Sequence, residues 1–319
     1  MSSWIKRLFK KEKSKARSVV GVDLTPVNAA WCQIAEVDSH LKIQGGRAIS
    51  DDFKSPADAM QALIETASLP NSDCYITLGH QYYNLLLVDA PPVPDQELRD
   101  AVRWKVKDLI AEPIDKVVVD AFRLPEDAYR GRMNMVYVAV IDSKVVKALL
   151  EVCEQADIDV CGINITELAM AAMTSEMRAL QQRSVAMLYL NGQSGTINLI
   201  ENGHLYLTRN IEVNAGSGGY TGNLDFQQDP VDNLALDVQR SLDYYESQIG
   251  KSGVSCVYLV SSSAEHNGWL EILQQRLPVK VELCQVPSDM MTEGSDFALP
   301  AGAVAAALGA AVGGLRDAV

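Results

Sequence analysis

The sequence predicts an α/β protein built from two similar lobes. Apolar strand patterns alternate with amphipathic helix patterns along most of the 319 residues. One strand–turn–strand–turn–strand pattern occurs at 18–49 and again at 184–213, about 165 residues further on. The chain is 48% hydrophobic, so it can bury a core large enough for two lobes.

The first lobe begins with three predicted strands, because three apolar runs are separated by polar turn residues. These strands are expected at 19–24, 30–36 and 41–49. A helix over about 56–68 and a strand over 73–78 follow.

The middle of the chain reads as strand, helix, strand, strand. The helix carries an apolar stripe at helical spacing, which consists of Leu98, Ala101, Val102, Val106, Leu109 and Ile110. Asp95 is expected to cap this helix, and Pro113 is expected to end it. A buried strand over 135–141 precedes Asp142, which is expected to cap a second helix.

A strand at 158–165 and a helix at 166–182 follow. The Asn202-Gly203 pair inside the second meander is typical of a β-hairpin turn. The remaining elements alternate between helix and strand, and they are expected at 230–250, 254–260, 267–277 and 279–286, with a closing Ala- and Gly-rich helix at 299–315. The small residues of this last helix predict close packing against a sheet.

The segment NAGSGGYTGNLDFQQDP, which precedes the helix at 230–250, is rich in glycine. It is either a phosphate cradle or a mobile surface loop. The loop interpretation is favoured because no Lys-Ser or Lys-Thr pair follows the glycines.

The composition excludes several classes of function. The net charge of −13 argues against nucleic-acid binding. The six cysteines form no CxxC pair and no zinc pattern with histidine, so we expect buried free thiols. No signal-peptide pattern and no strongly apolar stretch long enough for a membrane span is apparent.

Residues 1–17 form a basic tip with a net charge of +6, so the rest of the chain carries −19, the difference between −13 and +6. Trp4, Ile5, Leu8 and Phe9 lie at helical spacing among the cations. Two interpretations remain: a short interfacial helix on an anionic membrane, or a solvated terminus. The residues expected to contact the membrane in the first case are Trp4, Lys6, Arg7, Phe9 and Lys10.

The paired meanders resemble the actin-like ATPase fold, which is a ribonuclease H-like fold of two lobes. Three segments resemble PilM, the actin-like protein of type IV pilus assembly, and within that group the MshI-type proteins of the mannose-sensitive haemagglutinin (MSHA) pilus. They are LRDAVRWKVKDLIAEPIDKVVVDAFRL, VYVAVIDSKVVKALLEVCEQADIDVCGINITELAM and LALDVQRSLDYYESQ. The first of them, at 98–124, is the most specific.

The resemblance implies an FtsA-like division of the chain. Residues 18–84, completed by a terminal helix at 298–319, would form the first lobe. Residues 85–165 would form an inserted strand–helix–strand–strand subdomain, and residues 166–297 the second lobe.

The resemblance also implies a partner and a location. PilM proteins hold the cytoplasmic N-terminal peptide of PilN, a single-pass inner-membrane protein. The chain would accordingly be a cytoplasmic scaffold, peripheral to the inner membrane, that binds a PilN-like tail.

In the same family two hairpins grip the phosphates of ATP, and both depart from the pattern here. The first reads Asp23-Leu24-Thr25-Pro26-Val27 where the family has Asp-Ile-Gly-Ser-Ser. Asp23 remains as a Mg²⁺ candidate, but proline has no N–H to donate to a phosphate. The second carries a neutral Asn191 in place of a carboxylate, and a serine stands where the adenosine motif has Gly-Gly. The residues expected to line this degenerate ATP cleft are Asp23, Thr25, Asn191, Gly192, Ser194, Gly195 and Ser262.

Three hypotheses follow. The first is a scaffold whose cleft binds ATP and Mg²⁺ weakly or not at all. The second is a working actin-like ATPase that couples ATP to pilus assembly. The third is a sugar-kinase-like enzyme, which the sequence favours least because no aspartate is placed as a catalytic base and the four histidines are scattered: His40, His80, His204 and His266.

Overall fold

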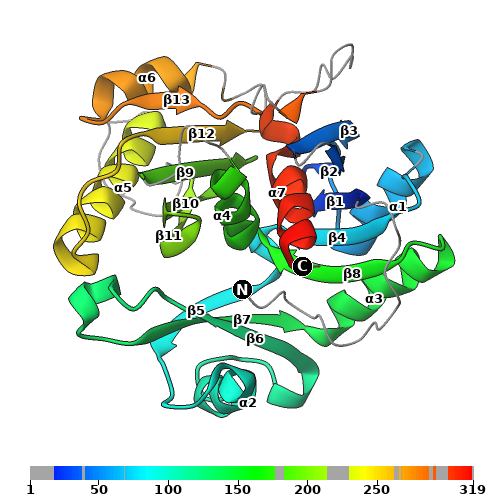
Figure 1. Ribbon diagram of the computed structural model, residues 1–319, viewed down its shortest axis with the longest axis horizontal. Coiled ribbons are helices and arrows are strands. Elements are labelled where there is room, and N and C mark those ends of the chain that lie inside the picture. Colours follow the sequence, from blue (N-terminus) through cyan, green and yellow to red (C-terminus); the bar gives the residue numbers. More distant parts are fainter. Residues whose placement is uncertain are drawn as a thin grey trace, which may run out of the picture.

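The protein is described from a computed structural model. The residues described are 18–37, 40–67, 69–176, 183–213, 230–261, 266, 268–286, 290–291 and 301–317. Within them the chain forms two five-stranded sheets and one three-stranded sheet (Figure 1). The basic tip, the glycine-rich segment and Ser262 lie outside the described residues.

The first sheet has the strand order β3-β2-β1-β4-β8. Its strands are β1 (Ser18–Leu24), β2 (Ala29–Val37), β3 (His40–Ile49), β4 (Asp73–Leu78) and β8 (Val160–Ile165). Helices α1 (Pro56–Thr66) and α3 (Ser143–Gln155) pack against one face. Asp142 caps α3 as predicted, because its Oδ1 accepts a hydrogen bond of 2.8 Å from the Lys144 N–H.

The second sheet repeats the meander, in the order β11-β10-β9-β12-β13. Its strands are β9 (Ser184–Asn191), β10 (Ser194–Glu201), β11 (His204–Glu212), β12 (Val257–Ser261) and β13 (Val281–Leu283). Helix α5 (Pro230–Tyr244), which continues as a π-helical turn (Tyr245–Ile249), and α6 (Trp269–Arg276) belong to the same lobe. Asn202 and Gly203 have φ values of 53° and 74°, so the predicted hairpin turn is confirmed.

Two helices, α4 (Thr166–Glu176) and α7 (Ala301–Asp317), lie between the two large sheets (Figure 1). They approach each other closely because of glycine. A Cβ atom on Gly309 of α7 would lie 2.1 Å from the carbonyl oxygen of Ala169 in α4. On β1, a Cβ on Gly21 would lie 1.9 Å from the carbonyl oxygen of Ala307. The predicted close packing of the terminal helix on a sheet is confirmed.

The inserted unit has the predicted order of strand, helix, strand, strand. Its elements are β5 (Asn84–Asp89), α2 (Asp95–Val106), β6 (Val117–Arg123) and β7 (Met135–Asp142), with the 3₁₀ turns His80–Tyr82, Ile114–Lys116 and η3 (Ala128–Gly131) around them. The three strands are ordered β5-β7-β6, and α2 covers one face.

Two details of the predicted α2 are wrong. Asp95 does not cap the helix, because its carboxylate pairs with Arg123 at 2.8 Å and Pro94 occupies the cap position. The helix ends at Val106 rather than at Pro113, since the Leu109 N–H bonds the carbonyl three residues earlier and tightens the chain into a turn.

Residues 143–165 of the expected subdomain lie with the first lobe. Strand β8 pairs with β4 in the first sheet, and α3 packs on α1. The strand–helix–strand–strand unit therefore ends with β7.

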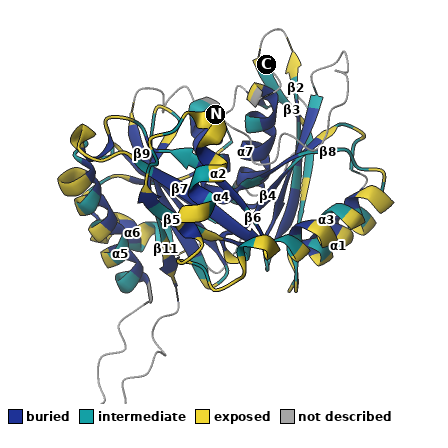
Figure 2. Cartoon of the chain, turned by 90° about the horizontal axis from the view of Figure 1, so that it is seen from below, coloured by how far each residue is buried: buried dark blue, intermediate teal, exposed yellow. Residues whose placement is uncertain are grey.

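Buried residues gather on the strands and on α4 and α7, whereas the outer faces of α1, α3, α5 and α6 are exposed (Figure 2). All six cysteines are free thiols, and all but the half-buried Cys161 are buried. Among the described helices, none combines the length and the apolar character that a membrane span needs.

Candidate functional site at the junction of the lobes

Successive side chains of β1 lie on opposite faces of the first sheet, and this alternation determines the direction of the Asp23 side chain. Val20, Val22 and Leu24 pack on the α1 and α3 side, while Val19 and Gly21 face α7 and the second lobe. Asp23 follows Gly21 at a spacing of two, so its carboxylate enters the junction between the lobes. It is 1% exposed.

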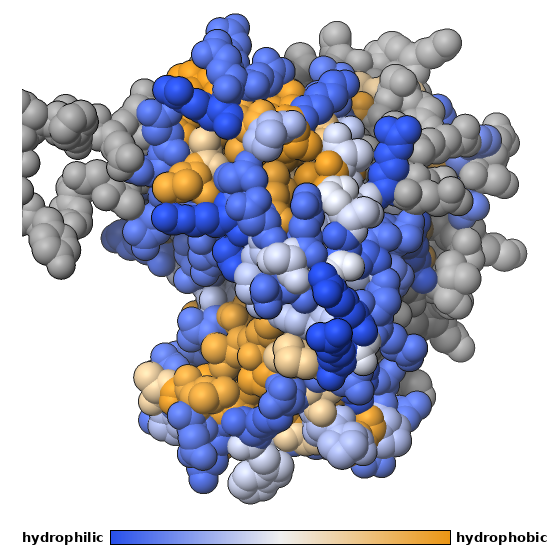
Figure 3. Space-filling model, turned by 90° about the vertical axis from the view of Figure 1, so that its left-hand side faces the viewer, coloured by the Kyte–Doolittle hydropathy of each residue, from blue (hydrophilic) through white to orange (hydrophobic). Residues whose placement is uncertain are grey.

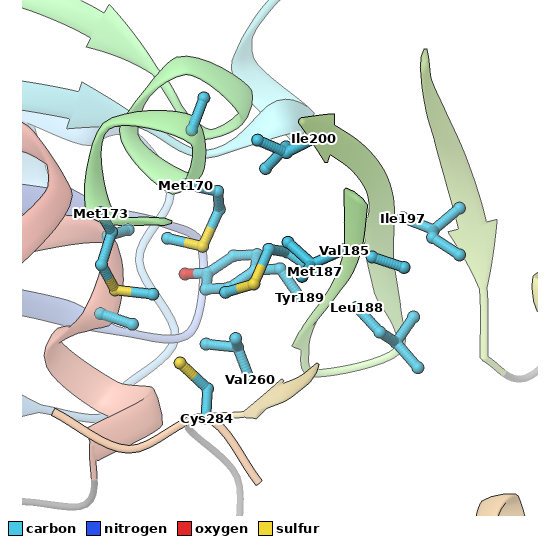
Figure 4. Close-up of a cluster of buried hydrophobic side chains, with 14 of the residues drawn as sticks. Met170, Met173, Val185, Met187, Leu188, Tyr189, Ile197, Ile200, Val260 and Cys284 are labelled. Atoms are coloured by element: carbon cyan, nitrogen blue, oxygen red, sulfur yellow. The ribbon is translucent and has the colours of Figure 1, made fainter. Parts of the chain in front are cut away.

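Tyr189 of β9 meets this carboxylate from the second lobe. Its hydroxyl donates a hydrogen bond of 2.9 Å to Asp23 Oδ2, and Tyr189 is 1% exposed. Figure 4 shows the Tyr189 ring among Met170, Met187 and Val260, with its oxygen directed away from the second sheet. Packing on both faces fixes the ring, so the hydroxyl is aimed at the first lobe.

The polar groups of the turn after β1 form hydrogen bonds with one another. Thr25 Oγ1 donates to the Asn28 carbonyl at 2.8 Å and accepts from the Asn28 N–H at 2.9 Å. The Thr25 N–H also bonds the Asn28 carbonyl. Pro26 has no N–H. The donors that a phosphate would need at Thr25 and Asn28 are therefore already engaged.

The turn after β9 closes on the first one. Gly192 has a φ of 62°, and a Cβ placed on it would touch the Val27 side chain at 3.5 Å. Gln81 donates to Ser194 Oγ at 3.0 Å, which adds a second bond between the lobes. Gly195 serves packing, because a Cβ there would lie 2.2 Å from the Tyr189 carbonyl oxygen.

The structure thus brings together six of the seven predicted cleft residues, the seventh being Ser262. Three side chains at the junction keep polar atoms without a hydrogen-bond partner among the described residues. They are Asp23 through Oδ1, Asn28 through Oδ1 and Asn191 through both amide atoms. Burial without full compensation raises the pKa of Asp23 to about 7, and the Tyr189 hydrogen bond only partly offsets this.

These residues do not fit a magnesium–nucleotide complex in the closed arrangement. Asp23 is the one carboxylate among the six cleft residues that the structure describes, and its Oδ2 accepts the Tyr189 hydrogen bond. The described part of the chain holds no group of three or more His, Cys, Asp or Glu side chains placed for a metal ion. The junction bonds one lobe to the other, through the buried Tyr189–Asp23 pair and the more exposed Gln81–Ser194 pair.

Tyr189 is the residue of this junction that the sequence did not reveal. Its run, SVAMLYLN, reads as a fully buried strand, and a tyrosine there is typical of core packing. The one signal available was the hydroxyl itself, since a buried tyrosine O–H needs an acceptor.

The free energy of unfolding is expected to rise by about 1–2 kcal/mol when the pH falls from 8 to 6. The folded-state pKa values of Asp23 and Glu167 are both raised by burial, to about 7. The folded protein therefore binds protons in this range that the unfolded chain does not. His80 opposes them, because burial lowers its pKa to about 4 and its unfolded form gains a proton near pH 6.5. Urea unfolding at both pH values measures the net effect, and Asp23→Asn should remove most of the rise, because Glu167 alone only slightly exceeds the opposing effect of His80.

Comparison with solved structures identifies the fold. A chain of the "PilM-PilN type IV pilus biogenesis complex" is similar at a TM-score of 0.72 and 17% identity, with 93% of this chain and 98% of that chain covered. A protein of Bacteroides thetaiotaomicron with an actin-like ATPase fold and unknown function gives a TM-score of 0.51 at 9% identity, with 83% and 90% covered. No family model matches the sequence, and neither does any curated protein. The chain has the actin-like two-lobe fold that the sequence predicted.

Proposed function

We propose that this protein is a cytoplasmic scaffold of a type IV pilus assembly platform, placed at the inner face of the inner membrane. It binds the cytoplasmic N-terminal tail of a PilN-like membrane protein. The observation that carries the proposal is the similarity over 93% of the chain to a member of a PilM–PilN complex. A match over 93% of the chain is too extensive to leave out the whole inserted unit, which distinguishes this layout from a bare pair of lobes.

The lobe junction agrees with a scaffold. Its lobes are joined by the Tyr189–Asp23 and Gln81–Ser194 hydrogen bonds, so closure needs no bound nucleotide. A clamp of this kind presents a fixed surface to a partner. We assign the degenerate cleft to this role, and we assign the system to the MSHA type because the 98–124 block resembles MshI-type proteins.

Peptide binding tests the scaffold. The probe is a fluorescein-labelled peptide that spans the cytoplasmic tail of the co-encoded single-pass protein, and anisotropy is measured with the full-length chain. We expect saturable binding in the micromolar range, about −8 kcal/mol. A scrambled peptide of the same composition is the matched control. Equal signals from the two peptides would rule out the proposed partner.

A working ATPase is the second candidate, and the unpartnered Asp23 Oδ1 favours it. For the scaffold we expect millimolar Mg-ATP to leave the thermal midpoint unchanged. A true ligand at about 100 times its Kd would add about 2.7 kcal/mol to the stability. A shift of that size that disappears in Asp23→Ala would favour the ATPase.

Membrane contact through the basic tip is part of the proposal and concerns Trp4, Lys6, Arg7, Phe9 and Lys10. Deleting residues 1–17 is expected to reduce co-sedimentation with anionic vesicles at low salt, because the deletion removes six net positive charges. Neutral vesicles provide the control. Unchanged sedimentation of the shortened chain would remove the tip from the proposal.

A further inference from the structure

A pocket of about 300 Å³ lies between the inserted unit and the second lobe. Strands β5 and β7 and the η3 turn form one side, and strand β11 and helix α5 form the other. It is separate from the lobe junction: neither Asp23 nor Tyr189 lines it. Its size is at the lower end of the range for ligand pockets, which suits one or two side chains better than a cofactor.

One wall is apolar and incompletely covered. Leu85 and Leu87 share a face of β5, and both are only partly buried. The intervening Leu86 points to the other face, where it packs with the core under α2. Figure 3, which views the side of the molecule where α5 lies, shows the apolar surface of the inserted unit below a hydrophilic band.

The opposite wall carries a cation, the guanidinium of Arg209. Arg209 of β11 lies with its guanidinium carbon 4.6 Å from the centroid of the Tyr244 ring. It forms no ion pair with any residue that the structure describes. Arg209 is half-buried, so its charge has lost part of its water. A cation in this setting favours an anion that can pair with it.

The acidic side chain that lines the pocket, Glu167, already accepts a hydrogen bond from within the protein. Glu167 is fully buried, and its Oε2 accepts a hydrogen bond of 2.5 Å from the Tyr83 hydroxyl. Burial also raises the pKa of Glu167 to about 7, so this carboxyl carries only part of a negative charge at neutral pH, whereas Arg209 carries a full positive charge.

The pocket is held in shape by bonds between the inserted unit and the second lobe. Lys251 Nζ lies 2.6 Å from Asp127 Oδ2, and the Tyr206 hydroxyl donates to Asp127 Oδ1 at 2.8 Å. Between these contacts and the pocket, Tyr129 and Arg130 have φ values of 54° and 57°. Two consecutive left-handed residues other than glycine are unfavourable and persist only where the surroundings fix them, as ligand clamps do.

We propose that this pocket binds an acidic segment of a partner protein, with a carboxylate paired to Arg209 and a neighbouring apolar side chain against Leu85 and Leu87. The inference goes beyond the proposed function, which does not state where or through which chemistry a partner is held. It stands or falls independently of whether the partner is PilN-like.

The test uses a matched pair of tripeptides, acetyl-Leu-Asp-Leu-amide and acetyl-Leu-Asn-Leu-amide, titrated into the full chain with ¹³C-labelled leucine methyl groups. The aspartyl peptide is expected to shift the methyl signals of Leu85, Leu87 and Leu207, which line the pocket. The asparaginyl peptide is expected to bind about 10- to 100-fold more weakly, because it loses the charge-assisted bond. Acetate is the third ligand tested, and methyl shifts as large as those from the aspartyl peptide would overturn the assignment of the pocket to a protein segment.

Variants separate this site from the rest of the surface. Arg209→Gln should make the two peptides indistinguishable, and Arg209→Lys should restore part of the difference. Trp104→Ala, at a side chain on α2 that is 76% exposed, is the matched control and should change nothing. Equal binding of the two peptides to the wild-type chain, or no methyl shift at millimolar peptide, would overturn the proposal. A pocket that responds while the PilN-like tail fails to bind would overturn only the proposed function.

Discussion

Gly309→Ala is expected to lower the free energy of unfolding by about 1–3 kcal/mol. The new methyl group would lie 2.1 Å from the Ala169 carbonyl oxygen, which is a backbone atom of α4 and cannot rotate away. The two central helices would have to separate, and both large sheets pack against them. Gly309→Leu is expected to lower the free energy of unfolding further, because the larger side chain has no space where α4 and α7 cross.

Gly313→Ala on the same helix provides the matched control. A Cβ at Gly313 would lie 3.6 Å from the Ala172 Cβ, which is an ordinary contact. Alanine has the higher helix propensity, so this variant should gain about 0.5–1 kcal/mol. Urea unfolding followed by circular dichroism measures both variants. If the two substitutions had the same sign, the close crossing would not exist as described.

Tyr189→Ala is expected to cost about 3–5 kcal/mol, because it empties the space of a fully buried ring and removes the hydrogen bond to Asp23. Tyr189→Phe separates the two contributions. It retains the ring and removes only the hydroxyl, so the buried Asp23 Oδ2 loses the hydrogen bond that it accepts from Tyr189. That variant should cost about 1–3 kcal/mol.

A double-mutant cycle assigns this cost to the pair. Asp23→Ala, which removes the acceptor, is combined with Tyr189→Phe, and both single variants and the double variant are compared with the wild-type chain by urea unfolding at pH 8. Side chains in direct contact are expected to show a coupling energy of about 0.5–3 kcal/mol. A coupling energy of zero would mean that the two lobes do not meet through these residues.

The strands were predictable because the signals for them are local. The apolar run before Asp23 and the Asn202-Gly203 turn can each be read within ten residues of sequence. The helix around Val102 was also predictable, but its two ends were not. Asp95 pairs with Arg123, which is distant in sequence, instead of capping the helix. The turn in which the Leu109 N–H bonds the Val106 carbonyl ends the helix before Pro113 is reached.

The chemistry of the junction was only half predictable, since it depends on residues far apart in the chain. Asp23 could be singled out from its hairpin, but its partner Tyr189 is 166 residues away and looks like a core residue. The same holds for the pocket. Arg209 stands out only when the structure places it opposite Leu85 and Leu87, in a different unit of the fold.

The contact of Gly21 with Ala307 joins positions 286 residues apart, the distance from 21 to 307. The face of the first sheet that packs against α7 therefore has no covering helix until nearly the whole polypeptide has been synthesised. Contacts of such long range slow the search for the native state, and the uncovered strands are prone to stick to other chains in the meantime. We expect refolding from urea to be slow and to need dilute protein or a chaperone.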